Sequence, residues 1–190
     1  MKWLKTIQSI VITLLAALCV PVAVAKPIDM PTVILVRHAE KAEEKLSDPL
    51  LSAAGLVRAE SLAAALKDAG VVAILTSPLQ RTILTAQPLA KARRITPQVI
   101  VLERGGIARH VEAVVAAIRK LGAGDVVLVV GHSNTVPAIV EALGGPSMPM
   151  LCESDYANLL VLTADAAGGV RVIRSRYGQV PGVATDPDCK

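Results

Sequence analysis

Side chains able to do polar chemistry follow several short apolar runs of the sequence. In chain order they are Arg37, His38, Arg81, Glu103, His132 and Ser133. A charged group beside an apolar strand needs a partner or a ligand, because burying it alone is costly. Two arginines and two histidines, without an obvious matching set of buried carboxylates, indicate an anion. Since the planar fork of arginine binds phosphate oxygens in pairs, the sequence predicts a phosphate site.

The elements that must position these side chains alternate along the chain. Short apolar, β-branched runs predict strands over 32–36, 71–75, 98–102, 126–130, 157–163 and 170–176. Apolar residues at helical spacing predict helices from the N-cap Ser52 to Gly70, and over 78–92, 111–121 and 136–143. This alternation predicts an α/β fold, a three-layer sandwich whose mostly parallel central sheet is flanked by helices. Ligands of such sheets bind beyond the carboxyl ends of the strands, which is where the predicted phosphate site falls.

Four segments resemble, in their order, the signatures of the histidine phosphatase (phosphoglycerate-mutase-like) superfamily. They are LVRHAE at 35–40, LSAAG at 51–55, SPLQRTILTA at 77–86 and VGHS at 130–133. The short length is similar to that of small members of the family, phosphohistidine phosphatases included, rather than to that of the mutases with their long insertions.

The resemblance implies a phosphatase whose nucleophile is a histidine. His38 would attack phosphorus and form a phosphohistidine, which water then hydrolyses. Arg37, Arg81 and His132 would hold the phosphoryl oxygens, with Ser133 as a further phosphate-binding residue. The two arginines disfavour protonation of His38, which must be neutral to attack. No cofactor is implied, and the sequence has no metal-ligand spacing, with three histidines and no Cys-x-x-Cys.

The chain departs from the family in the residue that protonates the leaving oxygen, because an R-E-x-x-x-G-x-W-E-G-type segment is absent. Glu103 is the candidate for this role. The alternative places Glu103 on the rim of the site, paired with Arg104 or Arg109. Glu40 and Asp155 are less favoured candidates. Without a donor, the enzyme would favour good leaving groups such as phosphohistidine or aryl phosphates.

Residues 1–25 have the layout of a secretory signal peptide. Lys2 and Lys5 precede an apolar stretch, and Ala23-Val24-Ala25 forms a small-x-small cleavage site. The apolar stretch is short for a spanning helix, and the alternative is an uncleaved anchor. Cleavage would leave 26–190 as a single histidine-phosphatase-like domain, exported to the periplasm or secreted, without a membrane span.

Two cysteines remain after that cleavage, Cys152 and Cys189. An even number of cysteines in an exported protein permits a disulfide, and two cysteines allow only one connectivity. We expect this pair to be bridged, and the alternative is two separate thiols.

Composition limits the classes of partner. With 53% apolar and 19% charged residues the chain is too apolar to be disordered. Lys and Arg number 20 against 16 Asp and Glu, and only 2% of residues are aromatic, so the basic stripe with interleaved aromatics of a nucleic-acid binder is not expected. The expected partner is a phosphorylated small molecule or a phosphoprotein substrate, and the oligomeric state stays open. The third histidine, His110, is expected on the surface of a helix.

Two other functions remain open at this stage. A catalytically weak sensor would keep the anion pocket without an efficient proton donor, and it would bind phosphate with little turnover. A phosphoglycerate-type mutase would transfer the phosphoryl group to an alcohol in competition with water. The mutase is less favoured, because the chain lacks the insertions that enclose such substrates.

Overall fold

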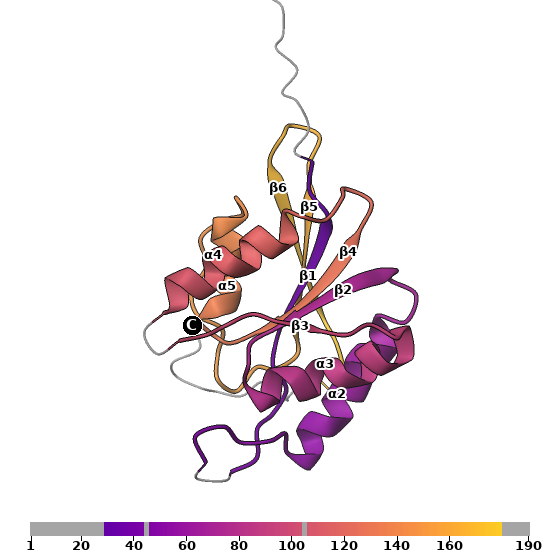
Figure 1. Ribbon diagram of the computed structural model, residues 1–190, viewed down its shortest axis with the longest axis vertical. Coiled ribbons are helices and arrows are strands. Elements are labelled where there is room, and N and C mark those ends of the chain that lie inside the picture. The colour runs from indigo at the N-terminus through magenta and orange to yellow at the C-terminus, as the bar shows by residue number, and fades with distance from the viewer. Residues whose placement is uncertain (1–28, 44–45, 104–105, 180–190) are drawn as a thin grey trace, which may run out of the picture.

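The computed structural model describes residues 29–43, 46–103 and 106–179 (Figure 1). The strands are β1 (Thr32–Arg37), β2 (Val71–Thr76), β3 (Gln98–Val99), β4 (Val126–Gly131), β5 (Asn158–Ala164) and β6 (Val170–Arg176). The helices are α2 (Ala53–Ala65), α3 (Gln80–Arg93), α4 (Ile107–Ile118) and α5 (Thr135–Ala142). The predicted signal peptide and Cys189 lie outside the described residues. Within the described part of the chain, no helix has the length and apolar character needed to cross a membrane.

The strands form one mixed sheet of six, in the order β3-β2-β4-β1-β5-β6. The first four in this order are parallel to one another, whereas β5 runs antiparallel to β1 and β6 antiparallel to β5. The carboxyl ends of β1, β2, β3 and β4 therefore meet at one edge of the sheet, as predicted. Because β5 is antiparallel, it brings its amino end, not its carboxyl end, to that same edge.

Helices cover both faces of the sheet, which confirms the predicted three layers (Figure 1). One apolar cluster joins α4 and α5 to the first face, with Val127, Val129 and Ile139 among its buried members. The other cluster joins α2 and α3 to the second face, around Leu62 and Leu89. Successive residues of β1 and β4 belong to opposite clusters, since side chains alternate across a strand. This explains why the central strands are continuous apolar runs.

The predicted elements are all present, but several of their boundaries differ. β3 has only two residues, because only Leu75 and Thr76 of β2 pair with it at the sheet edge. α3 begins at Gln80, so Pro78 lies before the helix and not in its first turn. α4 begins a turn earlier than predicted and includes His110, which is 3% exposed and hydrogen-bonded through Nδ1 to the Val101 carbonyl at 3.0 Å. The expectation that His110 is a surface residue was therefore wrong.

Gly55 explains why the LSAAG segment ends in glycine. Ser52 caps α2, and its hydroxyl accepts a hydrogen bond from the Gly55 N–H at 3.1 Å. A Cβ on Gly55 would stand 2.2 Å from the backbone oxygen of Glu40. The absence of a side chain therefore lets α2 pack against the segment that directly follows β1.

Candidate active site

The carboxyl ends of β1 and β4 place the two predicted histidines next to each other. Arg37 pairs in register with Gly131, and the His38 N–H donates to the Gly131 carbonyl at 2.9 Å. His132 follows directly, so the two imidazole rings lie with their centroids 5.4 Å apart in an edge-to-face arrangement. Two adjacent parallel strands thus bring together residues that are far apart in the sequence.

The His38 ring has a defined tautomer. Its Nδ1 lies 2.8 Å from the Ala39 carbonyl oxygen, which can only accept, so Nδ1 carries the proton. His38 is 5% exposed, and burial lowers its pKa from 6.5 to about 4, with the charges of Arg37 and Arg81 adding to the effect. The ring is therefore neutral near pH 7 and keeps a lone pair on Nε2.

His132 is held by hydroxyl groups. Its Nε2 shares a hydrogen bond of 3.0 Å with the Ser77 hydroxyl, which lies 3.0 Å from the Thr82 hydroxyl. Its backbone N–H donates to the Thr135 hydroxyl at 2.9 Å. Burial lowers the pKa of His132 to about 3, and His38 and nearby cations contribute. Both histidines are therefore neutral near pH 7, and the serine of the SPLQRT segment orients the second one.

Arg37 is buried, at 1% exposed, and is clamped by the segment that precedes β5. Its Nη1 donates to the Cys152 carbonyl at 2.6 Å and its Nη2 to the Glu153 carboxylate at 2.5 Å. The guanidinium carbon lies 4.3 Å from the centre of the Tyr156 ring, a cation–π distance. These contacts fix the orientation of the guanidinium group beside His38.

Arg81 approaches from the first turn of α3. Its Nη1 lies 3.7 Å from the Asp48 carboxylate, which also accepts from the Gln80 N–H at 3.0 Å. Burial lowers the pKa of Arg81 below its ordinary value; Asp48 opposes this shift and Arg37 adds to it. The guanidinium nevertheless stays charged, since arginine does not lose its proton in proteins.

One cavity of about 270 Å³ gathers most of the predicted residues. Its lining includes His38, Arg81, His132, Ser133, Glu153 and the loop residue Lys41. A larger cavity of about 790 Å³ lies beside the carboxyl end of α3, around Pro88, Arg94 and Pro97, and its lining contains none of the predicted site residues. Cavity volume alone would select the larger cavity as the active site. We take the smaller cavity as the candidate site, because the cations and neutral imidazoles converge there.

The sequence and the fold are both similar to those of known histidine phosphatases. The sequence matches the family model of the histidine phosphatase superfamily (branch 1) over residues 33–104. The predicted resemblance to this family is confirmed. No curated protein sequence matches the chain.

Solved structures share the histidine phosphatase fold. The protein histidine phosphatase SixA with tungstate superposes with a TM-score of 0.59 at 22% identity, covering 76% of this chain and 96% of SixA. A candidate phosphohistidine phosphatase SixA from Agrobacterium tumefaciens gives 0.55 at 24% identity, covering 78% of this chain and 97% of the other. A mycobacterial glucosyl-3-phosphoglycerate phosphatase with inorganic phosphate gives 0.56 at 18% identity, covering 79% and 98%. At these identities the likeness concerns the fold.

Glu103 lies apart from the cavity that holds the two histidines. Its carboxylate is 2.8 Å from the Arg109 guanidinium, and the two side chains are 58% and 75% exposed. Both residues line a separate small cavity at the start of α4, together with His110. This placement matches the rim alternative for Glu103, whereas Arg104 lies outside the described residues.

Glu153 is a site residue that the sequence analysis missed. One carboxylate oxygen binds Arg37, and the other accepts from the Ser133 hydroxyl at 2.7 Å. Partial burial favours the neutral acid, but the Ser133 hydrogen bond and the charge of Arg37 outweigh it and lower the pKa of Glu153. The residue precedes β5, so a search restricted to the carboxyl ends of strands passes over it.

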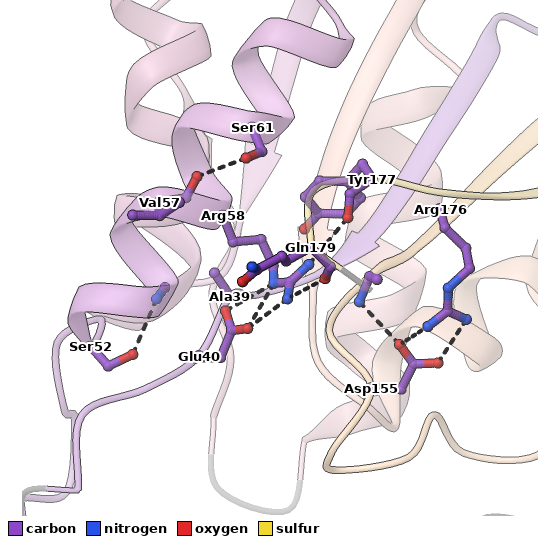
Figure 2. A network of polar contacts seen from close by, with 12 residues as sticks. Ala39, Glu40, Ser52, Val57, Arg58, Ser61, Asp155, Arg176, Tyr177 and Gln179 are labelled. Atoms are coloured by element: carbon purple, nitrogen blue, oxygen red, sulfur yellow. Dashed lines mark hydrogen bonds and ion pairs between the residues drawn. The ribbon is translucent and has the colours of Figure 1, made fainter. Parts of the chain in front are cut away.

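The two less favoured carboxylates have structural partners (Figure 2). The Glu40 carboxylate accepts hydrogen bonds from Nε and Nη2 of the buried Arg58 at 2.7–2.9 Å. Asp155 pairs with both terminal nitrogens of Arg176 at 3.0 and 2.8 Å. Neither residue lines the cavity with the histidines.

The bridge between Cys152 and Cys189 stays a prediction as a pair. Cys152 is disulfide-bonded, and Cys189 lies outside the described residues. Within the described ranges, no three His, Cys, Asp or Glu side chains are grouped in a way that could hold a metal ion.

Proposed function

We propose that this protein is an exported, metal-independent phosphatase that hydrolyses a phosphomonoester or a phosphoramidate through a phosphohistidine on His38. The observation that carries the proposal is the state of His38. The His38 ring is neutral, and its Nδ1–H donates a hydrogen bond to the Ala39 carbonyl. The ring lines one cavity together with Arg81 and His132. The family-model match and the likeness to known phosphatases support the reaction class.

The first chemical step follows from the His38 tautomer. The Nε2 lone pair attacks phosphorus, the bond from phosphorus to the leaving group breaks, and the leaving group departs with the electron pair. Both ring nitrogens are then substituted, so the phosphorylated ring carries a positive charge. The Ala39 carbonyl, which accepts the Nδ1–H, stabilises that charge. Water then attacks phosphorus, the phosphorus–nitrogen bond breaks, and neutral His38 and phosphate are released.

The neighbours of His38 supply the electrostatic part of catalysis. Arg37 and Arg81 are the cations next to it, and they would hold the phosphoryl oxygens on which charge is spread in a loose transition state. His132 would donate a hydrogen bond from its neutral ring, with Ser77 fixing its orientation. This set can neutralise the phosphoryl charge without a metal ion.

The leaving group is constrained by the lack of an unpaired carboxylic acid in the described lining of the cavity. Glu153 is held as an anion by Arg37 and Ser133, and Glu103 lines another cavity. A leaving group that needs little protonation, such as a phosphorylated imidazole or an aryl alcohol, therefore suits the site better than an alkyl alcohol. The fold likeness to SixA, described as a protein histidine phosphatase, supports the phosphoramidate class. Export rests on residues 1–25 of the sequence.

The test is hydrolysis of an aryl phosphate by the purified protein with EDTA present, beside a His38→Ala variant. We expect turnover in the parent that EDTA does not reduce and that the variant loses. Equal and negligible rates in both proteins would contradict the proposal.

A sensor is the second candidate, and the lack of an unpaired carboxylic acid among the described residues that line the cavity favours it. Glu153 is occupied by Arg37, and Glu103 pairs with Arg109. A sensor would bind inorganic phosphate in a calorimeter while showing no turnover on aryl phosphates or phosphoramidates. Turnover on either substrate would exclude this function.

A further inference from the structure

Glu153 places a negative charge inside a site built to bind an anion. Its side chain is 64% exposed and lines the cavity with His38, Arg81 and His132. The partner of its Oε2 is the buried Arg37, one of the two cations expected to hold a phosphoryl group. One carboxylate oxygen on that guanidinium occupies a donor that a phosphate oxygen could otherwise accept from.

The backbone holds this carboxylate in place. The Leu151 N–H donates to the Ser133 carbonyl at 3.0 Å, and the Asp155 N–H donates to the Cys152 carbonyl at 3.1 Å. The Ser133 hydroxyl binds the second carboxylate oxygen. Glu153 therefore differs from a solvated surface glutamate such as Glu103, whose arginine partner is itself 75% exposed.

Arg37 retains one donor for a ligand. Its Nε–H is buried and has no hydrogen-bond partner among the described residues, while Nη1 and Nη2 are engaged by Cys152 and Glu153. An incoming phosphoryl group can therefore take Nε–H and share the guanidinium with Glu153, or it can displace the carboxylate from Nη2. In both arrangements two anions compete for one cation.

We propose that Glu153 is an internal anion of the phosphate site that weakens the binding of phosphate to Arg37. The proposal rests on the proposed function, since it assumes that phosphate binds beside His38. Without Glu153, the cations and imidazoles around His38 would hold the phosphate product more tightly. Glu153 would lower affinity for the dianion of free phosphate and so favour product release.

The test is calorimetric titration of inorganic phosphate into the purified protein and into Glu153→Gln. Glutamine keeps the shape of the side chain and removes its charge. We expect Glu153→Gln to bind phosphate at least about tenfold more tightly than the parent, and product inhibition of aryl phosphate hydrolysis to strengthen by the same factor. Glu103→Gln, which removes the charge of a glutamate paired outside this cavity, should stay within about twofold of the parent.

Several outcomes are informative. Glu153→Asp keeps the charge and should bind phosphate as weakly as the parent. Glu153→Ala also removes the charge and should bind phosphate more tightly than the parent, so it replaces Glu153→Gln as the test if that variant fails to fold. Equal or weaker phosphate binding in both uncharged variants would overturn the proposal. If phosphate binding is not tightened but the parent still hydrolyses aryl phosphate, the proposed function is unaffected. Absence of phosphate binding in every protein would overturn this proposal, and absence of aryl phosphate hydrolysis as well would overturn the proposed function.

Discussion

Arg58 offers a sharp test of how the segment after His38 is anchored. Its guanidinium is 5% exposed and makes hydrogen bonds to Glu40 and to the backbone oxygens of Tyr177 and Gln179, at 3.1 and 2.9 Å (Figure 2). Replacing Arg58 with Met keeps most of the packing of the side-chain stem and removes every donor. The Glu40 carboxylate and two carbonyl groups then lose their partner.

The size of the effect follows from burial. Removing one partner of a buried ion pair costs about 3–5 kcal/mol. Glu40 is 22% exposed, so water can replace part of the loss, and we expect a decrease in unfolding free energy of about 3 kcal/mol. For a chain of this size, that corresponds to a lower Tm of roughly 6–12 °C.

The assay is urea unfolding followed by circular dichroism, with Arg176→Met as the matched control. Arg176 also makes a two-pronged pair, with Asp155, but it is 42% exposed, so its loss should cost below about 1 kcal/mol. In a double-mutant cycle, Glu40→Gln and Arg58→Met should show a coupling of at least about 1 kcal/mol. An Arg58→Met cost no larger than that of Arg176→Met would refute the reasoning.

Four further predictions concern the pH dependence of activity, the pH dependence of stability, packing and the second histidine. Because His38 must be neutral and its pKa is about 4, kcat/KM for an aryl phosphate should fall as pH falls through about 4; a fall centred near 6.5 would contradict this. The lowered pKa values of His38 and His132 also make folding stability depend on pH. The contribution of these two neutral histidines is fully present above pH 6.5 and is lost as the pH falls through about 4 and then about 3, which urea unfolding at several pH values would measure. Gly55→Ala should lower the Tm by several degrees, whereas Gly124→Ala, where no atom lies within 4 Å of the new Cβ, should not. Ser77→Ala removes the buried hydroxyl that orients His132 and also accepts from the Leu79 N–H, so it should lower kcat about tenfold or more and the Tm by a few degrees; an unchanged kcat would show that the hydrogen bond to His132 is not used.

The sequence predicted the central strands well for a physical reason. β1 and β4 are buried on both faces, so they appear as continuous β-branched runs such as VVLVV. The carboxyl-end rule then found Arg37, His38 and His132, because β1 and β4 are parallel neighbours.

The rule failed where the chain leaves the parallel pattern. Glu153 precedes β5, which is antiparallel and therefore brings its amino end to the edge of the sheet that holds the site. The sequence does not show that β5 is antiparallel, so a search for residues at the carboxyl ends of strands misses Glu153. Glu103 follows a strand that ends at Val99, so it lies beyond the sheet edge and its side chain turns to Arg109. His110 was misplaced because α4 begins earlier than its apolar periodicity shows. The errors over Glu153 and Glu103 come from tertiary arrangement, which a local sequence pattern does not record.

The most direct test of the central claim is detection of the covalent intermediate on His38. The protein would be mixed with an aryl phosphate, quenched within milliseconds into base, where phosphohistidine is stable, and analysed by intact-mass and peptide mass spectrometry. We predict an added phosphoryl group on the peptide that contains His38, absent in His38→Ala and lost when the sample is acidified. Turnover of the substrate without any phosphorylated His38, or with equal turnover in His38→Ala, would contradict the mechanism.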